Sequence, residues 1–177
     1  MDDYYYDAWT EDGTTPIGYR RVGWVAPVSV ARRKPNDVRA NDELPGQTQG
    51  PVTRTDIVKY AAASWDFNPI HHDETFARQA RSGGIIAHGM MVMGYLGRLA
   101  TAYLGTADFD RFKIRLLDVT RPGDTLRLAG RVTDVVPREK GVVVTLALRA
   151  TRTTGEVVAE GQVVATLSSN GTNGKLT

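Results

Sequence analysis

The sequence predicts an α+β fold in which one antiparallel β-sheet curls around one long central helix. The stretch from 88 to 104 is apolar on nearly every side, and a helix without a polar face must be buried on most sides. Residues 112–167 contain four runs rich in valine and leucine, largely alternating and separated by turn signals. A single sheet wrapped around the helix is the simplest way to bury both patterns.

The chain of 177 residues is long enough for one domain with a substantial core. We expect this domain to cover residues 39–168, followed by a disordered tail over 169–177. Residues 1–38 read as an N-terminal arm of uncertain order. Residues 1–16 carry five acidic side chains and no basic one, whereas residues 17–40 carry six basic side chains. Such an arm is either solvated or lies on the body of the protein or on a partner.

Local signals place the elements that precede the central helix. The turn-rich stretch from 41 to 52 can carry one short strand. Thr53 and Asp56 have the spacing of a capping box, so a helix starts at Thr53, and Pro69 stops it. Asp73 can cap a second short helix. After the central helix, the four runs are predicted to form consecutive hairpin strands.

Composition excludes several classes of function. The formal net charge is only +2, which gives little support for nucleic-acid binding. The chain has no cysteine, so disulfides, thiolate catalysis and cysteine-ligated zinc are excluded. The N-terminus lacks the pattern of a signal peptide, and no stretch reads as a membrane span. We therefore expect a cytoplasmic protein with no membrane partner, no nucleic-acid partner and no cofactor.

All three histidines of the chain lie between residues 66 and 91. Four residues separate Asp66 from His71, and Pro69 forces a bend between them, so both side chains can converge on one pocket. Asn68 is available to hold this turn by hydrogen bonding. A carboxylate next to an imidazole is a general acid–base pair, because histidine titrates near the operating pH. His72 is expected at the surface.

His88 and Gly89 stand at the start of the central helix. The free backbone N–H groups and the positive end of the helix dipole point outward there, as a site for a developing oxyanion requires. Because Gly89 lacks a side chain, a ligand oxygen can come close. Adjacent histidines seldom reach one ion and the HExxH spacing is missing, so we expect no metal.

Two stretches, YAAASWDFNPIHHDETFARQ and GGIIAHGMMVMGYL, closely resemble the MaoC-like (R)-specific enoyl-CoA hydratase family. The resemblance continues through RPGDTLRLAGRV and EVVAEGQVVATL and covers about residues 40–168. It implies a hot-dog fold, a homodimer or a higher assembly of dimers, and an enzyme of fatty acid or polyketide metabolism. The implied reaction interconverts trans-2-enoyl and (R)-3-hydroxyacyl thioesters by syn addition or removal of water.

Carried over by position, the resemblance assigns a role to several residues. Asp66 and His71 match the catalytic dyad of the family, and Asn68 matches the supporting asparagine. Gly89 matches the backbone donor to the thioester oxygen. We also expect Trp65, His88 and Met90 to contact substrate. Trp65 stands where relatives commonly carry a smaller residue, and residues 1–38 have no counterpart in the minimal family pattern.

Several alternatives stay open at this point. A hot-dog thioesterase would usually need a carboxylate on the central helix, and residues 88–107 contain none. A non-catalytic acyl-binding subunit of a heterodimer is disfavoured by the intact Asp66 and His71. A natural-product tailoring enzyme of the same fold could use the dyad for an intramolecular addition. The sequence leaves open whether the acyl carrier is coenzyme A or a carrier protein.

Overall fold

A computed structural model describes residues 8–9, 16–17, 33–105 and 107–169 of the chain. Most of the predicted N-terminal arm and the tail from 170 onward lie outside the described residues. The elements in chain order are β1 (Ala8–Trp9), β2 (Pro16–Ile17), η1 (Pro35–Asp37), β3 (Gln47–Gln49), α1 (Arg54–Ser64), η2 (Pro69–His71), α2 (Glu74–Gln79), α3 (Gly89–Leu104), β4 (Asp108–Leu116), β5 (Leu126–Arg138), β6 (Gly141–Arg152) and β7 (Val157–Ser168).

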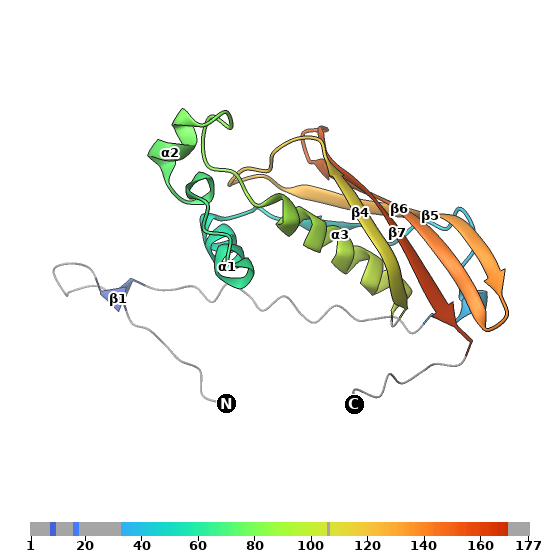
Figure 1. The fold of residues 1–177 in the computed structure, drawn as a ribbon. Coiled ribbons are helices and arrows are strands. Elements are labelled where there is room, and N and C mark those ends of the chain that lie inside the picture. The colour runs from blue at the N-terminus through green and yellow to red at the C-terminus, as the bar shows by residue number, and fades with distance from the viewer. Residues whose placement is uncertain (1–7, 10–15, 18–32, 106, 170–177) are drawn as a thin grey trace.

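The predicted α+β architecture is confirmed. A five-stranded antiparallel sheet has the order β3-β5-β6-β7-β4 and curves around α3, which lies against one face (Figure 1). The long strands alternate between buried apolar and exposed residues because successive side chains point to opposite faces of a sheet. The main core therefore fills the space between α3 and the buried face of the sheet.

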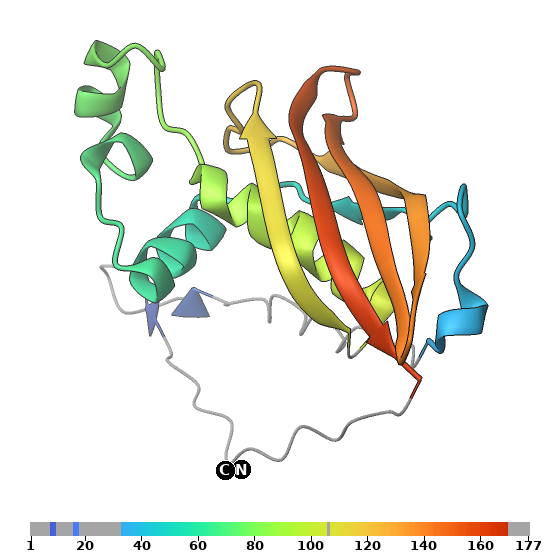
Figure 2. The ribbon, with the colours of Figure 1, turned by 45° about the vertical axis from the view of Figure 1, so that its right-hand side comes forward.

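The prediction of four consecutive hairpin strands is wrong for the first of them. β4 pairs with β7 and not with β5, so the connection from β4 to β5 crosses from one edge of the sheet toward the other (Figure 2). Residues 117–125 join the two strands: Leu117 still bonds to Val158 of β7, and the residues after it bond to other segments, among them Val52 and Ala87. β4 also begins at Asp108, four residues before the expected start.

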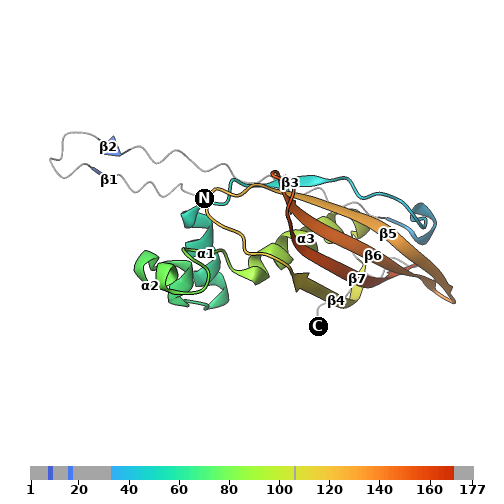
Figure 3. The same cartoon turned by 90° about the horizontal axis from the view of Figure 1, so that it is seen from above.

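The helical part lies beyond one end of the sheet. Seen from above, α1 and α2 stand beside the first turn of α3 (Figure 3). A second apolar cluster joins them to α3 through residues such as Ile57, Ala77 and Met91. Thr53 and Asp73 cap α1 and α2 as predicted, each accepting a backbone N–H in the first turn.

The end of α1 and the burial of α3 differ from the sequence prediction. α1 ends at Ser64, well before Pro69, because Trp65 adopts a left-handed conformation with φ of 56°. Contrary to the prediction, α3 is not buried on most sides: Leu96 and Leu99 face the sheet and Met91 packs toward α1 and α2, while Met90 is 57% exposed. A single sheet covers only one side of a helix. The exposed side of α3 could be buried only by atoms other than the described residues of one chain.

Residues 33–38 contact the domain. Val38 belongs to the main core, and the Arg33 guanidinium lies 4.0 Å over the ring of Tyr103 on α3. The division of the chain at residue 38 stays a prediction. No helix in the described part of the chain is long and apolar enough to cross a membrane.

Candidate active site

The end of α1 places Asp66. The left-handed Trp65 turns the chain out of the helix, and Asp66 follows directly in the turn that leads to η2. The backbone N–H of Asn68 donates to Asp66 Oδ1 at 3.3 Å, and Asn68 Oδ1 accepts from the N–H of Ile70 at 3.1 Å. Asn68 therefore links the carboxylate to η2, as expected for a residue that holds the turn.

His71, the last residue of η2, is only 9% exposed. Its Nδ1 lies 2.8 Å from the Ile86 carbonyl, and a carbonyl can only accept, so Nδ1 carries the proton. In the neutral ring this leaves a lone pair on Nε2, which lies 3.8 Å from Asp66 Oδ2. The free nitrogen of His71 and the carboxylate of Asp66 thus face each other at slightly more than hydrogen-bond distance.

The surroundings of His71 favour its neutral form. Burial lowers the pKa of His71 below its ordinary value, and the neighbouring His88 lowers it further. The hydrogen bond to the Ile86 carbonyl and the charge of Asp66 act in the opposite direction, but they are outweighed. A neutral imidazole with a free Nε2 is able to accept a proton, as a general base must.

His88 lies behind the pair and is 2% exposed. Its Nε2–H donates to the backbone carbonyl of Asp66 at 3.0 Å, and its ring stacks on His71 with centroids 3.7 Å apart. The ring of Tyr60 packs against it from α1 at 4.9 Å. His88 Nδ1 is buried and has no partner among the described residues. His88 is therefore placed to fix both members of the pair.

A cleft of about 340 Å³ opens beside this cluster, between the start of α3 and the chain that follows β4. Leu116 closes against Gly89: a Cβ on Gly89 would lie 2.2 Å from Leu116 Cδ1, so a side chain there would displace the leucine. The lining is mostly apolar and comprises Ile86, Ala87, Gly89, Val92, Leu116, Leu117, Asp118, Val119 and Thr120.

Asp66, His71 and His88 could offer three ligand atoms that lie within 4.8 Å of one another. The two imidazole rings are stacked with planes 24° apart, however, and an ion bound by imidazole lies near the ring plane. Two stacked rings with nearly parallel planes cannot both have the same ion in their plane and within bonding distance of a ring nitrogen. One ring must therefore rotate before the three groups can share an ion. The absence of a metal stays a prediction.

Comparison with known proteins identifies the family. Residues 37–154 match the MaoC like domain. The chain belongs to the MaoC-like family.

Individual relatives agree with this assignment. The chain is 32% identical to the (R)-specific enoyl-CoA hydratase of Rhodospirillum rubrum over 127 residues. This alignment covers 68% of this chain and 83% of the relative. The structure of the (R)-hydratase from A. caviae, involved in PHA biosynthesis, shares the fold with a TM-score of 0.65 at 21% identity, covering 73% of this chain and 97% of that one. The ChsH1-ChsH2 complex from Mycobacterium tuberculosis contains a chain that matches with a TM-score of 0.65 at 25% identity. The match covers 73% of this chain and 98% of that one. These neighbours confirm the hot-dog fold.

The residues predicted for the site of this MaoC-like protein fall into two groups. Asp66, Asn68, His71, His88 and Gly89 come together around the start of α3. Of these five, only Gly89 is among the residues that line the cleft. Trp65 is 84% exposed and Met90 57% exposed, and neither lines the cleft. Their contact with substrate stays a prediction. His72 is at the surface as expected, with Nε2 3.1 Å from the Phe67 carbonyl.

The candidate site contains several residues that the sequence did not indicate. The Ile86 carbonyl fixes the tautomer of His71, Tyr60 packs on His88, and residues 116–120 form a wall of the cleft. The only signal near the wall is the RPGD stretch at 121–124, whose residue types are typical of a turn. No local pattern indicates a backbone carbonyl or a packing tyrosine as part of a site.

Proposed function

We propose that this chain is a hydratase/dehydratase that interconverts trans-2-enoyl and (R)-3-hydroxyacyl thioesters. The observation that carries the proposal is the pairing of His71 Nε2 with Asp66 Oδ2 at 3.8 Å, with Nδ1 of His71 occupied by the Ile86 carbonyl. A gap of this size suits one water that contacts both groups. The Rhodospirillum rubrum relative is named an (R)-specific enoyl-CoA hydratase, which supports the same reaction.

In the hydration direction, the water oxygen forms a bond to carbon 3 of the enoyl group and gives up a proton to the dyad. The electron pair of the double bond moves toward the thioester oxygen, and carbon 2 then receives a proton from the dyad. Because Asp66 and His71 stand on the same side of the substrate, both additions occur on one face, which is syn addition. The reverse sequence removes water from the hydroxyacyl thioester.

The start of α3 supplies a group that can stabilise the negative charge formed on the thioester oxygen. The N–H of Gly89 belongs to the first turn of α3, where backbone donors have no acceptor within the helix. Together with the positive end of the helix dipole, it is suited to the enolate-like oxygen. We propose that the apolar cleft beside Gly89 receives the acyl group, because its volume lies at the lower end of small-ligand sites.

The test is a panel of 2-enoyl thioesters of increasing chain length, carried on coenzyme A and on an acyl carrier protein. We expect loss of the enoyl absorbance and formation of the (R)-3-hydroxyacyl product. An (S)-product would contradict the geometry of the dyad. Failure to hydrate any thioester of the panel would contradict the proposed reaction.

A second candidate is a non-catalytic acyl-binding subunit of a heterodimer. The observation in its favour is that one structural neighbour comes from the ChsH1-ChsH2 complex. The pairing of Asp66 with His71 argues against it, because a subunit that only binds has no need of a free basic nitrogen facing a carboxylate. Binding of a thioester without turnover, with activity restored by a second protein, would favour this alternative.

We also propose that the chain forms a homodimer or a higher assembly of dimers. β4 is the last strand of the sheet, so its outer edge is unpaired among the described residues. It carries Phe109 and Leu116, which are 37% and 50% exposed, followed by Leu117 at 44%. An exposed apolar edge of this kind favours association. Light scattering should give at least twice the chain mass, and a stable monomer at micromolar concentration would contradict the proposal.

A further inference from the structure

The outer wall of the cleft is part of the connection between β4 and β5. We call residues 116–124 the wall segment. On one side, the N–H of Leu117 donates to the Val158 carbonyl of the sheet at 2.9 Å. On the other, the Thr120 carbonyl accepts from the N–H of Ala87 at 2.7 Å, one residue before His88. The position of this segment therefore sets the width of the cleft.

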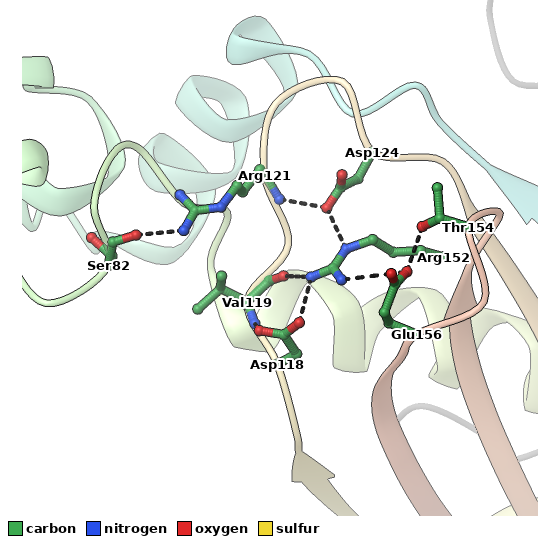
Figure 4. Close-up of polar contacts among 8 residues, drawn as sticks. All are labelled: Ser82, Asp118, Val119, Arg121, Asp124, Arg152, Thr154 and Glu156. Atoms are coloured by element: carbon green, nitrogen blue, oxygen red, sulfur yellow. Dashed lines mark hydrogen bonds and ion pairs between the residues drawn. The ribbon is translucent and has the colours of Figure 1, made fainter.

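One guanidinium holds the wall segment at several points. Arg152, the last residue of β6, donates from Nε to Asp124 at 3.0 Å and from one terminal nitrogen to Asp118 at 2.9 Å (Figure 4). The same nitrogen donates to the Val119 carbonyl. The side chain of Arg152 is only 16% exposed and that of Asp124 20%, so the contact between these two is largely shielded from solvent.

A second arginine continues the connection toward the site. The backbone N–H of Arg121 donates to the Asp124 carboxylate at 2.8 Å, and its guanidinium donates to the Ser82 carbonyl (Figure 4). Ser82 precedes the turn that leads to Ile86, whose carbonyl orients His71. Hydrogen bonds thus run from β6 through the wall segment to the stretch that carries the site.

We infer that Arg152, assisted by Arg121, is a positioning residue that fixes the wall of the cleft and thereby determines which acyl groups the site accepts. This inference rests on the proposed function. Arg152 is absent from the lining of the cleft, so it acts through the segment it holds.

The charge of Arg152 has a second consequence at the cleft. Asp118 lines the cleft and is 48% exposed. The hydrogen bond from Arg152 lowers the pKa of Asp118 and keeps its carboxylate turned toward the guanidinium. Without Arg152, an unpaired carboxylate would stand beside the apolar acyl chain, which disfavours binding. Lysine has a single charged nitrogen and cannot replace the three-point contact.

The test compares Arg152→Met with Arg149→Met, a matched control on the same strand. Arg149 pairs with Glu160 at 2.6 Å, but its side chain is 59% exposed and lies outside the cleft. For Arg152→Met we expect KM for enoyl thioesters to rise about tenfold with kcat changed less than about threefold, because binding rather than chemistry is affected. The preference among chain lengths should also change, whereas Arg149→Met should resemble the wild type. Arg152→Lys should recover only part of the loss.

Hydrogen exchange provides a readout that does not depend on activity. In Arg152→Met the N–H groups of Ala87 and Leu117 should exchange faster than in the wild type, and in Arg149→Met they should not. If Arg152→Met does not fold, Asp118→Asn removes one arm of the contact and serves in its place.

The outcomes separate the two proposals. Unchanged exchange, or chain-length preference and KM within twofold of the wild type, would overturn the role of Arg152. A wild-type protein that hydrates no thioester would overturn the proposed function, and exchange alone would then decide whether Arg152 holds the wall segment.

Discussion

Two regions of the molecule differ in what they bury. In β5, β6 and β7 the buried positions are apolar, as in Leu128, Leu146 and Val163, and the exposed positions alternate with them. In the stretch from 65 to 89, which we call the site segment, two histidines are buried at 9% and 2% exposure, whereas Trp65 and Phe67 are exposed at 84% and 51%. The sheet follows the usual distribution of side chains, and the site segment reverses it.

This reversal separates the region that stabilises the fold from the region proposed to carry the chemistry. Burying an imidazole whose Nδ1 lacks a partner among the described residues, as in His88, lowers stability unless other contacts compensate. The left-handed Trp65 adds backbone strain at the same place. The sheet and α3 supply the apolar burial that makes these features tolerable. Substitutions in the two regions should therefore affect different properties.

The largest effect is expected at the dyad. Under the proposed mechanism, Asp66→Asn keeps the shape but removes the carboxylate, and His71→Ala removes the imidazole, so each should lower turnover about 100- to 10,000-fold. Because both act on one water, the double variant should be little worse than either single one. For Asp66→Asn, which changes a half-exposed carboxylate, the free energy of unfolding should change by only about 1 kcal/mol. Steady-state hydration kinetics and chemical denaturation measure both properties.

The matched control for the dyad is His72→Ala. His72 is adjacent to His71 in the chain but exposed, and its ring contacts only the Phe67 carbonyl among the described polar groups. This variant should keep full activity. Full activity in both single dyad variants would remove the basis of the mechanism.

The reverse pattern is expected in the sheet. Leu146 lies in β6, the middle strand, and is completely buried. Leu146→Ala should lower the free energy of unfolding by about 2–5 kcal/mol, because it removes apolar contacts and leaves a cavity. Turnover per folded molecule should stay near the wild-type value. Ala147→Ser, at the exposed neighbouring position, should change stability by less than about 0.5 kcal/mol.

A smaller effect of opposite sign is expected at Trp65. Its φ of 56° is unfavourable for a bulky side chain and suits glycine. Trp65→Gly should therefore raise the free energy of unfolding by about 1 kcal/mol. Thermal denaturation tests this directly. A clear loss of stability would mean that the edge contact of Trp65 with Phe67, with centroids 5.7 Å apart, outweighs the backbone strain.

The smallest effect concerns pH. Burial lowers the pKa of His71 in the folded protein, so the unfolded chain takes up its proton at higher pH. The stability linked to this residue is fully present above its unfolded pKa of 6.5 and is lost as the pH falls from there toward the folded pKa. His71→Gln should therefore show a weaker decline in melting temperature than the wild type between about pH 7 and pH 5. In His72→Gln the decline should match the wild type, and an equal decline in His71→Gln would contradict the assignment.

Local patterns in the sequence were sufficient for much of the fold and for the centre of the site. The caps at Thr53 and Asp73 and the alternation in the long strands each depend on residues a few positions apart. The approach of Asp66 to His71 belongs to the same class, because the turn at Pro69 that joins them spans only a few residues. Such contacts form between residues that are close in the sequence, so their residue types and spacing in a single sequence are enough to predict them.

Other features were decided only by the tertiary structure. The pairing of β4 with β7, the stacking of His88 on His71 and the contacts of Arg152 with Asp118 join residues between 17 and several tens of positions apart. The tautomer of His71 likewise depends on the carbonyl of Ile86, which every residue type would provide. These contacts follow from how α3 and the sheet pack together, because packing and not local spacing determines which distant groups meet.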